Sequence, residues 1–114
     1  MPTPETILKD EIKRAFKKVR ADLYIPQDAQ HRGVPDCIIC LNGRSIRIEL
    51  KASNKAPTPL QQRRLEAHAE AGGISGVYRK VDGTYKFESF GLAAASGYFP
   101  PDALVEYLDN ITKE

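Results

Sequence analysis

The sequence predicts a single α/β domain in which helices flank a mixed central β-sheet. Two dipeptides, Asn42-Gly43 and Asp82-Gly83, each separate two short apolar runs and favour the type I′ turn of a β-hairpin. Apolar residues recur at helical spacing in three other stretches that alternate with these runs. A length of 114 residues suits one compact domain. The expected strands are residues 23–25, 37–41, 44–51, 74–81 and 84–90.

The first predicted helix covers residues 4–20, with Thr3 as its N-cap and Pro4 at its first position. Its apolar stripe comprises Leu8, Ile12, Ala15, Phe16 and Val19. At about 100° per residue, Glu5 lies about 35° from the centre of this stripe and Glu11 about 85° from it. We therefore expect Glu5 to face inward, although an acid in the first turn also simply complements the helix dipole.

The register of the first hairpin follows from its turn. If Leu41 faces Arg44 across Asn42-Gly43, Asp36 lies opposite Glu49 on the neighbouring strand. Directly opposed side chains share one face of the sheet, with Cβ atoms about 4.5–5.5 Å apart. The sequence therefore predicts two neighbouring carboxylates at one end of this hairpin.

Two carboxylates at this separation repel each other unless a positive charge lies between them. A divalent cation with oxygen ligands removes the conflict between Asp36 and Glu49. Lys51 lies on the same face, two residues beyond Glu49, and adds a further positive charge. The alternative interpretation is that Asp36 only bends the strand start, while Glu49 and Lys51 form a solvated polar face. A β-bulge would also separate the two acids.

Cys37 and Cys40 have the CxxC spacing that metal and redox sites use. Residues three apart on a strand point to opposite faces of the sheet. We therefore interpret both cysteines as small strand residues in a reducing compartment, rather than as a zinc or redox pair.

The second predicted helix begins with Thr58-Pro59-Leu60-Gln61, in which Thr58 and Gln61 form a capping box. It ends at Gly72-Gly73. Residues 91–99 are small and irregular, and Pro100-Pro101-Asp102 begin a third helix. One face of that helix presents Leu104, Leu108 and Ile111. This C-terminal stretch either packs on the core or forms a dimer contact.

Charge is distributed unevenly along the chain, although the net charge is only +2. Residues 1–64 contain 13 Lys or Arg and 7 Asp or Glu, a balance of +6. Residues 65–114 contain 4 and 8, a balance of −4. The basic half holds the Asp36 and Glu49 pair, an arrangement that suits a phosphate-backbone ligand.

Pro35-Asp36 followed by Glu49-Leu50-Lys51 resembles the PD-(D/E)xK nuclease signature. More narrowly, the chain resembles the VRR-NUC family over roughly residues 5 to 90, through Gly33-Val34-Pro35-Asp36, Glu49-Leu50-Lys51-Ala52, Thr58-Pro59-Leu60-Gln61 and Gly72-Gly73. The resemblance implies a restriction-endonuclease-like fold. It implies one nuclease domain over residues 1–114, with a core at about 4–90 and a C-terminal helical extension at about 91–114.

The resemblance also implies roles for individual residues. The expected ligands of Mg²⁺ or Mn²⁺ are Glu5, Asp36, Glu49 and the Leu50 carbonyl, with Glu11 as the fallback for Glu5. The expected catalytic residues are Asp36, Glu49, Lys51 and Gln61. Basic residues near the motif are the expected phosphate contacts, namely Arg32, Lys55, Arg63 and Arg64.

The activity implied by this resemblance is metal-dependent hydrolysis of DNA, by a homodimeric Holliday-junction resolvase that selects branched DNA. Two alternatives stay open: a nickase or flap-type nuclease with the same site, and a non-catalytic DNA-binding or interaction module. The sequence has no signal peptide and no apolar run long enough to cross a membrane. We therefore expect a cytoplasmic protein of a bacterial or phage-infected cell, without a membrane partner.

Overall fold

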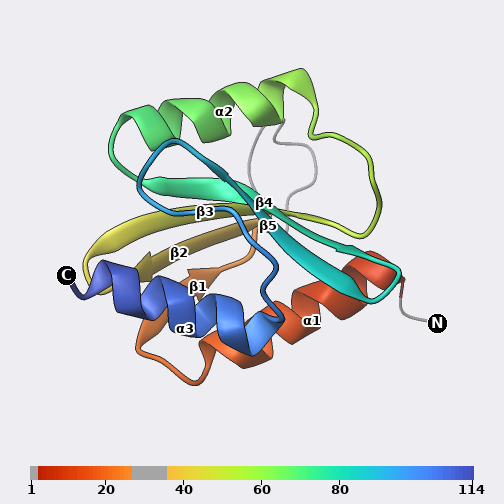
Figure 1. Ribbon diagram of the computed structural model, residues 1–114, viewed down its shortest axis with the longest axis horizontal. Coiled ribbons are helices and arrows are strands. Elements are labelled where there is room, and N and C mark those ends of the chain that lie inside the picture. Colours follow the sequence, from red (N-terminus) through yellow and green to blue (C-terminus); the bar gives the residue numbers. More distant parts are fainter. Residues whose placement is uncertain (1–2, 27–35) are drawn as a thin grey trace.

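The structure, a computed structural model, describes residues 3–26 and 36–114 and has three layers, with a five-stranded sheet between helices (Figure 1). The elements are α1 (Pro4–Phe16), β1 (Ala21–Tyr24), β2 (Cys37–Leu41), β3 (Arg44–Lys51), α2 (Pro59–Glu70), β4 (Ile74–Val81), β5 (Thr84–Phe90) and α3 (Pro101–Thr112). The predicted α/β class is confirmed.

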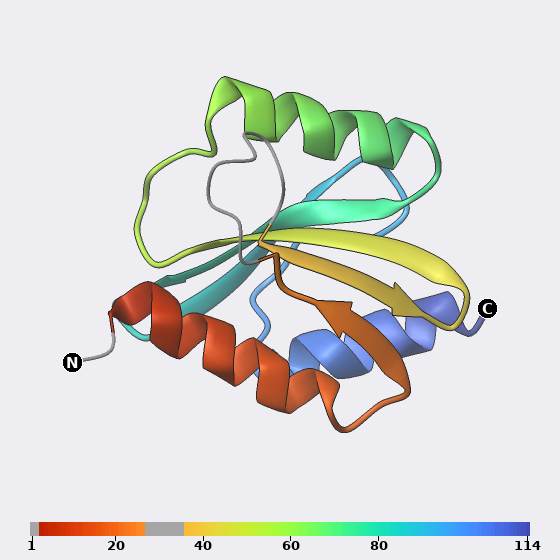
Figure 2. The ribbon, with the colours of Figure 1, turned by 180° about the vertical axis from the view of Figure 1, so that it is seen from behind.

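The strand order in the sheet follows the chain, β1-β2-β3-β4-β5. β3 and β4 are parallel, while the other neighbouring strands are antiparallel, so the sheet is mixed as predicted. Parallel neighbours need a crossover connection, and α2 provides it. α2 covers one face of the sheet, and α1 and α3 cover the other (Figures 1 and 2).

The predicted register of the first hairpin is confirmed. Leu41 pairs with Arg44, and the ladder continues without a bulge to Cys37 and Ile48. Asn42 and Gly43 both have positive φ, at 51° and 79°, as a type I′ turn requires. The turn residues therefore fix which side chains of β2 and β3 face each other.

The main core lies between the sheet and the α1–α3 layer. From β3, it contains Ile46, Ile48 and Leu50, none of which is more than 1% exposed. The buried stripe of α1 consists of Leu8, Ile12, Ala15 and Phe16. Because these apolar β3 residues face α1 and α3, the intervening Arg47, Glu49 and Lys51 point to the α2 side.

α1 ends at Phe16, so the predicted extension to residue 20 is wrong. Lys17 is the C-cap, and the chain then turns through residues 17–20 to enter β1 at Ala21. Val19 still packs against the core, which explains why it matched the helical spacing. The strand predicted at residues 23–25 starts two residues earlier and ends at Tyr24.

The C-terminal helix packs on the core. Leu104, Val105 and Leu108 of α3 are at most 2% exposed. The Asn42 side-chain amide donates to the Asp109 backbone carbonyl at 3.2 Å and to Thr112 Oγ1 at 3.0 Å. α3 thus buries apolar surface and fastens the turn between β2 and β3. Within the described residues, the helices are too short or too polar to span a membrane.

Candidate active site

Asp36 and Glu49 come together at one end of the sheet. Asp36 immediately precedes β2, and its Oδ2 accepts a hydrogen bond of 2.8 Å from the Leu50 backbone N–H. Glu49 lies in β3 and is only 2% exposed. The confirmed register explains the meeting, because one more step along the ladder beyond Cys37 and Ile48 reaches these two residues.

The surroundings of the buried Glu49 carboxyl disfavour its ionised form. Burial raises its pKa far above the ordinary value for glutamate, and the neighbouring Asp36 raises it further through a shared hydrogen bond and its charge. Lys51 lowers this pKa, while Glu5 raises it. Glu49 Oε2 is buried and has no hydrogen-bond partner among the described residues. A buried carboxylate oxygen without a donor favours a cation at this position.

The two acids of α1 lie in different surroundings. Glu5 is exposed rather than buried, and its charge acts on Glu49, so its role as a metal ligand stays a prediction. Glu11 is half-buried and accepts from Lys80 Nζ at 3.0 Å and from the Tyr85 hydroxyl. Glu5 is exposed because it lies in the first turn of α1, before the buried stripe begins at Leu8. Of the two acids, Glu11 is committed to fastening α1 to β4 and β5.

The Asp36 and Glu49 carboxyls fit a hard divalent cation in their chemistry. Both are oxygen donors, they lie side by side, and one Glu49 oxygen lacks a protein partner in the described structure. No cluster of three or more His, Cys, Asp or Glu side chains suited to a metal ion occurs in residues 3–26 and 36–114.

Cys37, which follows Asp36 in the chain, does not contribute a thiolate to this site. Cys37 is fully buried and Cys40 is exposed, so they face opposite sides of β2 as predicted. Burial, and then the negative charge of Asp36, raise the pKa of the Cys37 thiol to about 12. Both thiols are free, and Cys37 stays protonated within the core.

The remaining predicted site residues lie on the segment that leads into α2 or outside the described residues. The capping box of α2 is confirmed, with Gln61 Oε1 accepting from Thr58 N–H at 2.9 Å. This bond shows the structural role of Gln61, and its catalytic role stays a prediction. Lys55, Arg63 and Arg64 are exposed on the loop and first turns that lead into α2. Arg32 and the Gly33-Val34-Pro35 stretch lie outside the described residues.

Sequence reasoning missed Arg79, which anchors the loop after β3. Arg79 pairs with Lys51 across the parallel ladder. Its Nη1 donates to the backbone carbonyls of Ser53 at 2.7 Å and Lys55 at 2.6 Å, and its Nη2 pairs with Glu88 Oε1 at 3.0 Å. The guanidinium therefore holds the chain that follows Lys51. An arginine in an apolar strand was the available signal, but it did not reveal which residue of β3 lies beside it.

Arg79→Lys is expected to loosen the loop after β3. One ammonium group cannot reproduce the planar fork that reaches two carbonyls and a carboxylate together. We expect a loss of about 1–2 kcal/mol in the free energy of unfolding, measured by urea denaturation. We also expect faster hydrogen exchange at residues 52–58 than in the wild type. Unchanged exchange in this loop would contradict the anchoring role.

A second polar cluster fastens α2 to the sheet. His68 of α2 bonds through Nε2 to Ser45 Oγ at 2.8 Å, and through Nδ1 to Ser75 Oγ. Burial, and secondarily the charge of Arg47, lower the pKa of His68 and favour the neutral ring. A neutral ring between two hydroxyls satisfies its partners without a net charge, so this cluster serves the packing of α2.

The fold is shared with a known domain. A solved structure described as "VRR_NUC domain" is similar to this chain, with a TM-score of 0.60 and 23% sequence identity. The alignment covers 70% of this chain and 87% of that one. No family model matches the sequence, and no curated protein does. The chain thus has a VRR-NUC-type, restriction-endonuclease-like fold, as the resemblance implied.

Proposed function

We propose that this protein is a divalent-metal-dependent nuclease that hydrolyses phosphodiester bonds of DNA. The observation that supports the proposal is the buried Glu49 carboxyl beside Asp36, with an Oε2 that has no partner in the described structure. Lys51 follows on the same face of β3, and the fold is that of a VRR-NUC domain. Two neighbouring carboxyls, with a lysine on the same face of the sheet, are suited to binding a cation and a phosphate together.

In this proposal Asp36, Glu49 and the Leu50 carbonyl hold Mg²⁺ or Mn²⁺, and Glu5 approaches from the first turn of α1. When bound, such an ion offsets charge on the phosphate and makes an attacking water more acidic. The Leu50 N–H bond to Asp36 Oδ2 keeps that carboxylate oriented toward Glu49. The Arg79 anchor fixes the backbone that follows Lys51.

The other polar residues act on water and phosphate. Lys51 positions the attacking water or helps to remove its proton, and in its charged form it offsets charge on the phosphate. Gln61 orients the water or the phosphate from the first turn of α2, where backbone N–H groups also favour an anion. Water attacks the phosphorus in line and the 3′ oxygen leaves, so the products are a 3′-hydroxyl and a 5′-phosphate.

We further propose branched DNA, and a four-way junction in particular, as the substrate of a homodimer. Two identical sites related by a two-fold axis suit two matched nicks in a symmetric junction. Lys55, Arg63 and Arg64 are exposed and, in this proposal, contact the phosphates of the DNA, with Arg32 as the fourth basic residue in this role.

The test is cleavage of a labelled four-way junction beside matched duplex, single strand and flap, each with Mg²⁺, Mn²⁺ or EDTA. Paired symmetric nicks in the junction alone, abolished by EDTA, are the expected result. Metal-dependent cutting of the other substrates instead would support the nuclease proposal and contradict the preference for a junction. No cutting of any substrate would contradict the nuclease itself. A monomeric mass in gel filtration, with and without junction, would contradict the dimer.

A further inference from the structure

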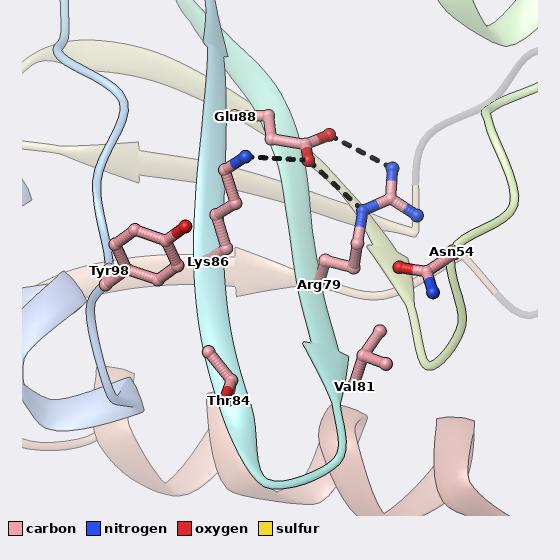
Figure 3. A pocket seen from close by; sticks show the side chains of 7 residues that line it. All are labelled: Asn54, Arg79, Val81, Thr84, Lys86, Glu88 and Tyr98. Carbon is pink, nitrogen blue, oxygen red and sulfur yellow. Dashed lines mark hydrogen bonds and ion pairs between the residues drawn. The ribbon is translucent and has the colours of Figure 1, made fainter.

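A pocket of about 340 Å³ lies against β4 and β5 (Figure 3). The residues of these strands that line it lie on the same face of the sheet as Glu49 and Lys51. Side chains from β4, β5 and two loops line it, including Asn54, Arg79, Thr84, Lys86, Glu88 and Tyr98. The face follows from the ladders, because residues paired across strands share a face. Lys51 pairs with Arg79, and Arg79 pairs with Lys86.

These pairings form a row of three cations across the sheet, from Lys51 on β3 through Arg79 on β4 to Lys86 on β5. Neighbouring strands lie about 4.8 Å apart, so the row is about 10 Å long. A DNA strand carries a phosphate about every 3.4 Å along the axis of a duplex and is longer when extended. The row therefore reaches one to three nucleotides away from a phosphate held at Lys51.

Arg79 and Lys86, two cations that line the pocket, differ in how fully their charges are paired within the protein. Arg79 is committed to Glu88 and to two loop carbonyls, so it forms the wall of the pocket. Lys86 Nζ lies 3.7 Å from Glu88 Oε2, and the lysine side chain is 43% exposed. Figure 3 shows Lys86 between Glu88 and Tyr98. Lys86 is thus the cation that remains accessible to a phosphate.

Tyr98 provides an exposed aromatic surface on a fixed backbone. The residue is 71% exposed, and its ring centroid lies 5.8 Å from Lys86 Nζ. Gly97, just before it, exchanges two backbone hydrogen bonds with Phe87 of β5, at 2.8 and 3.0 Å. The carbonyl of Phe99, just after it, accepts from the Tyr78 hydroxyl at 2.6 Å. Exposed rings held in this way are suited to stacking with nucleobases.

We propose that this pocket binds a nucleotide that flanks the cleaved bond, with its base stacked on Tyr98 and its phosphate at Lys86. The inference rests on the proposed nuclease function and identifies where the DNA strand runs after it leaves the carboxylate pair. In this proposal the DNA strand crosses β4 and β5 along the row of cations that runs from Lys51 to Lys86. Asn54 and Thr84 also line the pocket and offer polar groups to the same nucleotide.

Binding of a fluorescein-labelled single strand and of a labelled four-way junction, measured by anisotropy in EDTA, tests the pocket without cleavage. Tyr98→Ala is expected to weaken binding by about fivefold or more, because one stacked base contributes about 1–3 kcal/mol. Tyr98→Phe should retain the affinity. Lys86→Ala should weaken binding and flatten its salt dependence, whereas Lys86→Arg should not. Leu92→Ala and Lys18→Ala are the controls, since both residues are exposed and lie outside the pocket lining.

Photocrosslinking gives the position of the bound nucleotide. A 5-bromouracil placed at successive positions around the cleavage site should crosslink to Tyr98 at one offset only, within three nucleotides of the cleaved bond. The pocket proposal is wrong if the wild type binds and cleaves DNA, both alanine variants bind it with wild-type affinity, and no crosslink forms at Tyr98. In that case the nuclease proposal is unaffected. If the wild type neither binds nor cleaves DNA, the nuclease proposal and the pocket fail together.

Discussion

Asp36→Asn is expected to abolish metal-dependent cleavage of DNA while leaving the fold intact. The asparagine oxygen can still accept the Leu50 N–H bond that Asp36 Oδ2 accepts at 2.8 Å, so the backbone arrangement is preserved. The substitution removes one of the two charges that face a metal ion. Electrostatic stabilisation by such a site contributes several kcal/mol to the transition state, so we expect a loss of at least about a hundredfold in kcat/KM.

Two measurements support this interpretation of Asp36→Asn. Circular dichroism and urea unfolding should match those of the wild type within about 1 kcal/mol, and stabilisation of the protein by added Mn²⁺ should disappear. Asp22→Asn is the matched control, because Asp22 is an exposed residue of the edge strand β1. Cleavage by Asp36→Asn at the wild-type rate would remove Asp36 from the site.

Glu49→Gln is expected to stabilise the metal-free protein at neutral and alkaline pH, although it destroys the metal site. Burial raises the pKa of Glu49, and Asp36 raises it further. At pH 8 the folded protein must therefore either ionise a buried Glu49 carboxyl that lacks a donor at Oε2 or keep this carboxyl protonated. Both cost free energy relative to the unfolded state, in which the carboxyl is ionised in water. A glutamine amide is neutral and can donate to the Asp36 carboxylate. We expect a gain of about 1–3 kcal/mol.

The pH dependence has a definite sign. Because the folded-state pKa of Glu49 lies above the unfolded value of about 4.3, the folded state binds more protons and the stability due to this group declines as pH rises between the two values. In EDTA, the advantage of Glu49→Gln over wild type should therefore be small at pH 5 and large at pH 8. Urea unfolding at the two pH values measures it. An equal difference at both would contradict a buried, uncompensated Glu49.

Glu88→Gln provides a control of opposite sign. The hydrogen bond and charge of Arg79 lower the pKa of Glu88. The stability due to Glu88 is therefore present above its unfolded pKa and declines as pH falls through the lower folded value. Glu88→Gln should be less stable than wild type at pH 8, and the deficit should shrink under acid conditions. The two glutamines thus separate a specific effect of Glu49 from a general effect of pH on the fold.

The first hairpin was predictable from sequence because local chemistry fixes it. Asn42-Gly43 accepts two positive φ angles, so the turn dictates the pairing of every residue on β2 and β3. The meeting of Asp36 and Glu49 follows from that register alone. The capping box at Thr58 and the last two strands were predictable for the same reason, since each depends on residues close together in sequence.

The remaining parts of the site depend on contacts between distant segments. Arg79 reaches the loop after β3 because β3 and β4 pair in parallel, and a crossover helix does not specify that register. Helical spacing placed Glu5 near the apolar stripe, but it could not show that the first turn extends beyond the buried face. Glu11 lies farther from the stripe, and its carboxylate accepts from Lys80 of β4 and Tyr85 of β5. Long-range pairing decided each of these positions.

Cleavage of labelled DNA by the wild type and by Lys51→Ala, in Mg²⁺, Mn²⁺ and EDTA, tests the central claim most directly. Lys51 is half-buried beside Glu49, and its truncation should leave the fold intact. We expect cleavage by the wild type that requires the metal and is lost in Lys51→Ala, with both proteins purified identically. Cleavage that persists in EDTA, or that Lys51→Ala performs as well as the wild type, would contradict a metal-dependent nuclease at Asp36, Glu49 and Lys51.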